Sequence, residues 1–421
     1  MSIGFTFTGE ISRPEELIAA ARTLAEEREY RVGAGDKGLR AALCPLGGEL
    51  TIYWQRRPEE PDIWHIQGEC VSTPAGPGLH RAAVELVDAL PIRGLRVEDE
   101  TGFFQTRDFL RMREEHFYPW LRTLVDICRQ ESGKGACGMR LCWDLEQYAP
   151  QDIPDTVVTP MGRFRLAELV ELVEQEGIAA LAERFFLWNG RTRDAQFYRA
   201  RALNLLWERC RYAPSGDSGE DEGVNNAILR DLERAAKLAP GLPLPRAAYE
   251  EVCALAGQEP SLPEGPALAE EFSPGYRKGP VTYAVGALRL TLPGRCRCTW
   301  EQWENGGGAH LWSDITGPVW RVNSYRTREG DACFTHNLDT LHGVEGRTLK
   351  GGALRWGWRE IREGTQRLYQ VQCEVITGPS LFVLTAACSD PRDLGTAAEV
   401  IGNIRVAPAR REDQGDEGGA R

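Results

Sequence analysis

The residues from 367 to 406 constrain the fold of their end of the chain more than any other stretch. Apolar and polar side chains alternate over 369–375, which is typical of a strand with one buried and one wet face. A turn leads to the almost continuously apolar run 381–388, which indicates a strand covered on both faces or nearly so. Asp390 and Pro391 then begin a helix with apolar residues at helical spacing. The stretch predicts two paired strands and a helix that folds back on them.

The length of 421 residues exceeds what one compact core usually holds, so we expect two or three domains. The predicted fold class is α+β. The pattern of helical and strand-like segments predicts an N-terminal α+β domain, a helical region, a linker, an antiparallel sheet domain with a packed helix, and a disordered tail. Their predicted bounds are residues 1–105, 106–257, 258–280, 281–407 and 408–421.

The N-terminal domain is predicted to contain strands flanked by two helices. Within it, Gly33, Gly35 and Gly38 match the letters of a dinucleotide-binding loop, G-x-G-x-x-G. Such a loop needs a helix N-terminus next to it, whereas here a strand-like run broken by Pro45 follows. We therefore interpret these glycines as a hairpin turn.

The helical region carries a series of amphipathic segments, in which Pro119 is expected to bend or restart a helix. The segment LERAAKLAPGLPLPRAAYEEVCALAG resembles the junction between two tetratricopeptide repeats. The resemblance covers roughly one and a half repeats, fewer than a solenoid needs. It therefore favours a helical layer docked on the rest of the protein.

Strands of the last domain are expected at residues 282–292, 319–325, 331–335 and 354–360, before the hairpin and helix described above. The order of "LPG", "GGALRWGW", "RLYQVQCEVITGPSLFVLTAACSDP" and "IGNIRV" is similar to the PsbP-like fold, a group that includes the DcrB-type chaperones of bacterial secreted effectors. The resemblance spans residues 280–406. It implies a one-sheet binding module with a partner surface and no catalytic centre, and no functional residue is carried over.

Tryptophan is concentrated in this domain, where six of the chain's twelve lie between residues 300 and 358. Two of them share a strand face, Trp356 and Trp358, and two are one helical turn apart, Trp300 and Trp303. One interpretation is the core of a modest sheet domain. The other is an aromatic surface for a peptide or apolar helix. The predicted partner-binding residues are Trp300, Trp303, Trp312, Trp356 and Trp358.

The formal net charge of −12 argues against binding to nucleic acid. The longest apolar runs fall far short of the roughly 20 residues of a spanning helix, so no membrane insertion is expected. The first residues lack the basic start and apolar core of a secretory signal, and we expect a cytoplasmic protein.

Candidate metal ligands are present, but their spacing does not form a site. Cys296, Cys298, His310, Cys333 and His336 are suitable ligand types for zinc. No second paired motif completes a tetrahedral set, so we expect no metal and no cofactor. The twelve cysteines are dilute and sit mostly in apolar segments, which favours reduced, buried thiols.

Catalytic signatures are equally sparse, since the sequence has no G-x-S-x-G elbow. Asp144, Glu146, Asp152 and Asp155 could pair as carboxylates for acid–base chemistry, or they form a solvated acidic loop. We predict no catalytic residue.

The sequence therefore predicts a non-enzymatic bacterial module that binds a protein or peptide partner, as a chaperone, adaptor or immunity partner of a secreted effector. One alternative is a hydrolase with its site between the N-terminal domain and the helices near residues 143–155. Another is a scaffold whose helical layer is the docking surface. The oligomeric state stays open.

Overall fold

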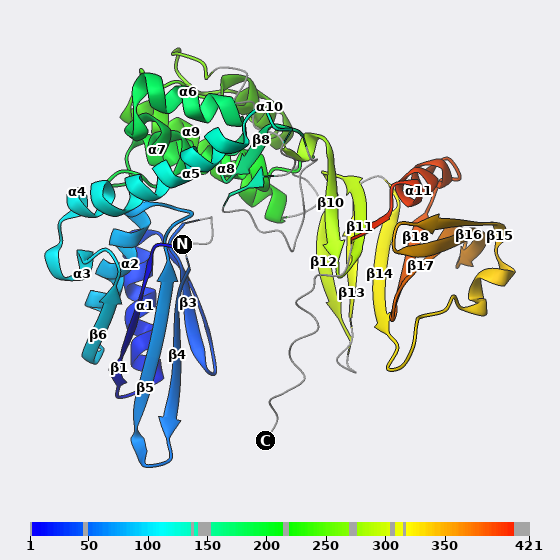
Figure 1. Ribbon diagram of the computed structural model, residues 1–421, viewed down its shortest axis with the longest axis horizontal. Helices are drawn as coiled ribbons and strands as arrows, with labels where there is room; N and C mark the ends of the chain where they lie inside the picture. The colour runs from blue at the N-terminus through cyan, green and yellow to red at the C-terminus, as the bar shows by residue number, and fades with distance from the viewer. Residues whose placement is uncertain are drawn as a thin grey trace. The chain divides into compact units, whose positions relative to one another are not determined.

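The computed structural model describes residues 2–44, 49–135, 139–141, 153–213, 219–268, 276–303, 308–314 and 317–407 (Figure 1). Contacts divide these residues into two compact units. Unit 1 holds the described residues up to Cys210 and those from 219 to 268, and unit 2 holds Tyr276 onward with Arg211–Ala213. The fold is mixed α+β with antiparallel main sheets, as the sequence predicted. In the described ranges, no helix is both long and apolar enough to cross a membrane.

Unit 1 begins with a six-stranded antiparallel sheet in the order β2-β3-β4-β5-β1-β6. Its strands are β1 Gly4–Ile11, β2 Arg31–Gly35, β3 Gly38–Ala42, β4 Glu49–Arg57, β5 Glu60–Val71 and β6 Arg93–Asp99. Helices α1 (Pro14–Arg28) and α2 (Pro77–Ala89) lie on one face (Figure 1). Gly35 pairs with Gly38 across a two-residue turn, so the hairpin interpretation of the glycine motif is confirmed.

The rest of unit 1 is a helical layer with a small three-stranded sheet. Its helices are α3 Phe103–Thr106, α4 Phe109–Met112, η1 Arg113–Phe117, α5 Tyr118–Glu131, α6 Leu166–Glu176, α7 Ile178–Phe185, α8 Ala195–Glu208, α9 Gly219–Leu238 and α10 Arg246–Ala256. The strands are β7 Met139–Arg140, β8 Thr156–Thr159 and β9 Gly162–Arg165. The π-helical turn η1 ends at Phe117 and α5 begins at Tyr118, and the backbone stays helical at both residues. The predicted restart of the α-helix beside Pro119 is therefore confirmed, without a break in the chain of helical residues.

The predicted boundary near residue 105 does not separate two compact units. The N–H of Trp188 donates to the carbonyl of Ala75 at 2.7 Å, and the N–H of Gly78 donates to the carbonyl of Trp188 at 2.8 Å. The rings of Phe117 and Phe186 meet edge to face, with centroids 5.7 Å apart. The sheet and the helices thus share hydrogen bonds and one core.

The first half of the predicted linker is docked on the helices of unit 1. The hydroxyl oxygens of Ser261 and Tyr249 lie 3.0 Å apart, and the Ser261 hydroxyl donates to Glu233 at 2.8 Å. Leu244 forms a parallel bridge with Ala267. Proline and glycine in this stretch therefore prevent regular secondary structure without preventing attachment. Residues 269–275 and the predicted tail 408–421 lie outside the described part of the chain.

Unit 2 is built on a seven-stranded antiparallel sheet in the order β12-β13-β14-β18-β17-β16-β15. Its strands are β12 Arg297–Gln302, β13 Gly308–Ser313, β14 Val319–Arg326, β15 His342–Leu349, β16 Gly352–Glu363, β17 Gln366–Thr377 and β18 Ser380–Cys388. A smaller sheet holds β10 Pro280–Val285, β11 Leu288–Pro293 and β19 Arg405–Val406, and helix α11 is Asp393–Gly402. The two strands and helix predicted for residues 367–406 are confirmed, and helix α11 contacts both strands.

Two strand predictions in unit 2 differ from the structure. The stretch 282–292 is not one strand but part of the hairpin β10–β11, which turns at Gly286 with a φ of 55°. The stretch 331–335 forms no strand, because it is bound to β17 by hydrogen bonds to a buried carboxylate. Thr335 donates both its N–H, at 2.7 Å, and its hydroxyl to the fully buried Glu374.

Candidate functional site

Most of the predicted tryptophans lie on the inner face of the seven-stranded sheet, which is the face that carries the buried side chains of Trp312, Trp320 and Val322. In antiparallel strands, directly paired residues share a face. Trp312 pairs with Trp320, and Trp356 pairs with Cys373 in the same buried layer. Trp312 is 1% exposed and Trp320 is 2% exposed. Trp312 is therefore a core residue, and the prediction that it offers a surface to a partner does not hold in this structure.

Trp356 and Trp358 share a face, as the two-residue spacing predicts, but it is the inner face. Trp358 pairs with Val371, and its ring lies 5.2 Å from His342 and 6.3 Å from Tyr369. Both tryptophans are half-buried. Their removal would disturb packing as well as any contact with a partner, so they are weak probes of binding.

Trp300 is the exposed member of the group, with 57% of its surface accessible. It lies in strand β12, not in a helix, so Trp300 and Trp303 are not one helical turn apart. The Trp300 ring packs edge-on against His310 at 4.7 Å, and His310 stacks on Trp312 at 5.6 Å. Trp312 in turn contacts Tyr283 at 5.3 Å. An aromatic ladder therefore runs from the sheet edge into the core.

The position of Trp300 depends on a glycine in the neighbouring strand. A Cβ atom at Gly308 would lie 2.2 Å from Cζ2 of Trp300 and 2.6 Å from the carbonyl oxygen of Glu301. Only glycine leaves room for the indole above the β13 backbone. Burial lowers the pKa of His310, which favours a neutral ring beneath the indole.

Trp303 follows β12 and reaches the opposite side of the strand. The guanidinium carbon of Arg321 lies 5.3 Å from the centre of its ring, and Arg321 also pairs with Glu301 at 3.3 Å. Side chains alternate between the two faces along β14, and Trp320 and Val322 point to the inner face. Arg321, which lies between them, therefore points to the outer face. Trp300 and Trp303 thus lie on the two sides of the same edge strand.

The two edges of this sheet differ in how they are protected. At one end, β15 is interrupted by a register shift between His342 and Glu345 and contains Gly343 in a left-handed conformation. At the other, β12 pairs with β13 without any shift over residues 297–302. Bulges are a usual means of preventing an edge from accepting another strand. No described strand pairs with the outer edge of β12.

A second arrangement of polar residues lies inside unit 1, where a histidine is completely buried. Ser72 Oγ lies 2.8 Å from His80 Nδ1, and His80 Nε2 lies 3.1 Å from Asp99 Oδ1. The ring is enclosed by Phe5, with ring centroids 5.4 Å apart, and by two further phenylalanines. The network ties the start of α2 to the ends of β5 and β6.

Asp99 is held as a carboxylate by four donors. Oδ1 accepts from the N–H and the hydroxyl of Thr101, both at 2.8 Å, and Oδ2 accepts from the N–H of Phe104 at 2.8 Å. Burial by itself raises the pKa of Asp99, but the hydrogen bonds and charge of His80 and the two backbone donors outweigh it and hold the pKa well below its usual range.

Ser72, His80 and Asp99 are the residue types of a hydrolytic triad, but their environment is closed. The side chains of His80 and Asp99 are 0% exposed, and Ser72 is equally buried. The serine hydroxyl also lies 3.1 Å from the carbonyl of Ile3. A nucleophile must reach its substrate, so this network stabilises the fold and has no access for chemistry.

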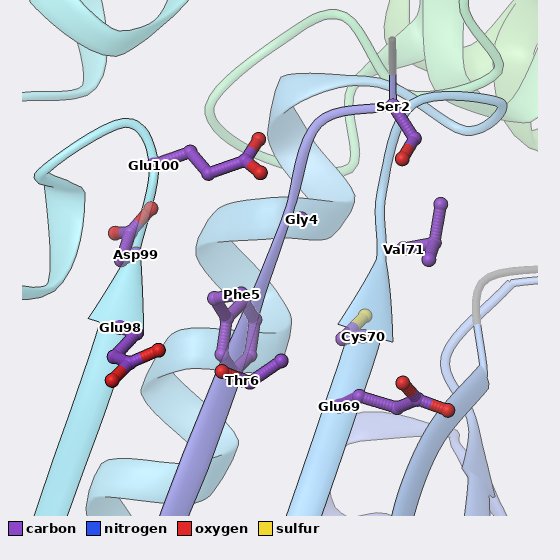
Figure 2. A pocket seen from close by; sticks show the side chains of 10 residues that line it. All are labelled: Ser2, Gly4, Phe5, Thr6, Glu69, Cys70, Val71, Glu98, Asp99 and Glu100. Atoms are coloured by element: carbon purple, nitrogen blue, oxygen red, sulfur yellow. The ribbon is translucent and has the colours of Figure 1, made fainter.

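An open hollow of about 510 Å³ adjoins this network on the outside. Figure 2 shows Glu98, Asp99 and Glu100 on one wall, Phe5 at the centre and Glu69 on the other wall. Among the described residues, no group of three or more His, Cys, Asp or Glu side chains could hold a metal ion. Cys296, Cys298, His310, Cys333 and His336, which are suitable ligand types without suitable spacing, form no such group in the described part of the chain. The hollow is an acidic surface lined by Glu69, Glu98, Asp99 and Glu100.

The segment of the predicted hydrolase site lies mostly outside the described residues, including Asp144, Glu146 and Asp152. Asp155 is described: its carboxylate accepts from the N–H groups of Gly133 at 3.0 Å and Gly135 at 3.2 Å. This carboxylate closes a turn after α5.

Sequence reasoning missed the buried network and one further group, Arg199, which is described below. His80 and Asp99 are 19 residues apart and belong to different elements, so no local pattern connects them. A histidine on an otherwise apolar helix face was the only local signal.

Fold and surfaces together define a two-unit α+β protein whose most exposed large aromatic side chain among the described residues lies at an unprotected sheet edge. No family model matches the sequence, and no curated protein is similar to it. A crystal structure from Bacteroides thetaiotaomicron aligns with 32% of the chain at 13% identity and a TM-score of 0.23. The aligned part spans 56% of that structure. Function is therefore inferred from the geometry of the chain itself.

Proposed function

We propose that this protein is a non-enzymatic, cytoplasmic protein-binding module that takes an extended segment of a partner along strand β12. The carrying observation is Trp300, 57% exposed on an edge strand that no described strand covers. An added strand supplies main-chain hydrogen bonds for affinity, and its alternate side chains give specificity.

The two tryptophans of this edge support the same proposal. Side chains of an added strand alternate between the faces of the sheet, so one set meets Trp300 and the other meets Trp303. Exposed aromatic groups are frequent anchors at interfaces. The partner segment is therefore extended and carries apolar residues on at least one face. A role as chaperone, adaptor or immunity partner of a secreted effector follows from the sequence resemblance alone and is part of this proposal.

The test uses a photo-crosslinking amino acid at Thr299, an exposed position of β12, in the full chain within its native cell. We expect a crosslinked partner that mass spectrometry identifies. Trp300→Ala should then weaken its binding roughly thirtyfold, as expected for a central tryptophan anchor. The matched control is Tyr325→Ala, which removes an aromatic side chain of similar exposure, 52%, from β14 of the same sheet.

Two outcomes contradict the proposal. One is a partner that binds Trp300→Ala and wild type equally well. The other is a crosslink that forms as efficiently from position 325 as from position 299, since the edge would then have no preference.

A further inference from the structure

A separate pocket of about 310 Å³ lies in the helical layer of unit 1. Its volume is at the lower end of the roughly 300–1,000 Å³ typical of ligand sites. Most of its wall is apolar and is contributed by Met161, Phe164, Leu203, Pro243, Ala267 and Leu268. Three charged residues complete it, namely Glu183, Arg184 and Arg199.

Arg199 brings a guanidinium into this pocket with few partners. Its Nε is buried without a hydrogen-bond partner, and its Nη1 donates to the carbonyl of Pro243 at 3.4 Å. Burial lowers the pKa of Arg199, and the charge of Glu183 opposes that shift. A guanidinium has five N–H donors, and leaving a buried donor unpaired is unfavourable. Nε is shielded from the pocket, whereas Nη2 makes no hydrogen bond within the described residues and can donate to the acceptor of a ligand.

Glu183 does not occupy Arg199 as an ion-pair partner in the described structure. Its carboxylate accepts from Asn189 Nδ2 at 2.6 Å, and Asn189 is 4% exposed. Burial raises the pKa of Glu183. Arg184 is paired with Glu176 at 3.9 Å, so Arg199 is the cation of the lining that forms no ion pair within the described residues, which favours a ligand with a single negative charge. A dianion such as phosphate would be repelled by Glu183.

Backbone hydrogen bonds hold the part of the wall formed by Pro243, Ala267 and Leu268. The N–H of Leu244 donates to the carbonyl of Pro266 at 3.1 Å, and the N–H of Leu268 donates to the carbonyl of Leu244 at 2.8 Å. Arg246 holds the same segment through the carbonyl of Pro263 at 2.7 Å. The pocket is thus pre-formed, which lowers the entropic cost of binding.

We propose that this pocket binds a small organic carboxylate with an apolar group. The carboxylate accepts from the free donors of Arg199, since planar guanidinium and carboxylate groups match each other in geometry. The apolar group lies against Phe164 and Leu203. This site is independent of the β12 edge and does not rest on the proposed partner.

The test is isothermal titration calorimetry of the full chain with octanoate and phenylacetate as probes. We expect saturable one-to-one binding of at least one of them, binding of octanol at least tenfold weaker, and no binding of inorganic phosphate. Arg199→Met should weaken carboxylate binding roughly tenfold or more, because it removes the charge but keeps an apolar stem. The matched control is Arg209→Met, at the exposed end of the same helix α8, which should bind as wild type does.

A second variant protects the test against a folding defect. Leu203→Trp fills the apolar part of the pocket and leaves Arg199 in place, so it should also abolish binding while circular dichroism stays unchanged. The proposal is overturned if neither carboxylate gives saturable heat, if Arg199→Met binds like Arg209→Met, or if phosphate binds as tightly as the probes.

Discussion

Replacing Asp99 by asparagine tests the buried histidine–carboxylate network. The substitution keeps the size of the side chain but removes its charge and one of its two acceptor oxygens. If the amide nitrogen replaces Oδ2, it faces the N–H of Phe104, which now lies 2.8 Å from that oxygen. If it replaces Oδ1, it faces the two donors of Thr101 and that of His80 instead. Either orientation leaves at least one buried donor unpaired.

The expected loss of stability is large for a single isosteric change. Breaking one side of a buried charged pair costs about 3–5 kcal/mol, because the remaining group stays buried without compensation. For a unit of this size, 1 kcal/mol corresponds to roughly 2–4 °C, so the melting temperature of unit 1 should fall by roughly 6–20 °C. The matched control is Asp88→Asn, whose 3.0 Å pair with Arg107 is solvent-exposed and should cost about 0–1 kcal/mol.

Hydrogen exchange measured by mass spectrometry separates the two units, since peptides from β1, β5, α2 and β6 report on unit 1 alone. Asp99→Asn should lower protection there, and peptides of β17 and β18 should be unaffected. Because the pKa of Asp99 is lower in the folded than in the unfolded chain, its stabilisation is present at neutral pH and is lost as the pH falls below about 4. The difference in free energy of unfolding between wild type and Asp99→Asn should therefore become smaller as the pH falls below about 4. Equal stability of Asp99→Asn and Asp88→Asn at pH 7 would refute the reasoning.

Two further predictions concern unit 2. Trp312→Ala should reduce the free energy of unfolding by about 3–5 kcal/mol in urea titration, because it empties a core position that is 1% exposed. Trp300→Ala should change the free energy of unfolding by less than about 1 kcal/mol. Similar losses for the two variants would mean that the aromatic ladder is not graded from edge to core. Glu374→Gln should lower the free energy of unfolding by about 1–3 kcal/mol, since it replaces one carboxylate oxygen that accepts from Thr335. It should also raise the rate of hydrogen exchange at residues 332–341. Unchanged exchange there would show that the carboxylate does not hold this segment.

Local patterns in the sequence predicted those elements whose partners are close along the chain. The alternation over 369–375 and the apolar run over 381–388 predicted β17 and β18, because a hairpin pairs neighbouring residues. The glycines from 33 to 38 predicted the β2–β3 turn for the same reason. In each case the strands and the turn that fixes their register lie within one short segment.

Features set by distant contacts could not be predicted in this way. A two-residue spacing places Trp356 and Trp358 on one face, but which face is buried depends on elements elsewhere in the chain, such as α11, which packs on β17 and β18 of the same sheet. The stretch 331–335 was predicted as a strand, yet Thr335 and the buried Glu374 hold it as a loop through hydrogen bonds to the carboxylate. The Ser72–His80–Asp99 network joins three elements and has no local signature.

The docked segment 259–268 decides where the chain can be divided. A version of unit 1 ended at Gly257 would remove Ser261, the partner of both Tyr249 and Glu233. It would also remove Ala267 and Leu268, and with them one wall of the Arg199 pocket. Truncation after Leu268 keeps all of these contacts. When unit 1 is expressed separately, its C-terminus should therefore not be placed at the end of helix α10.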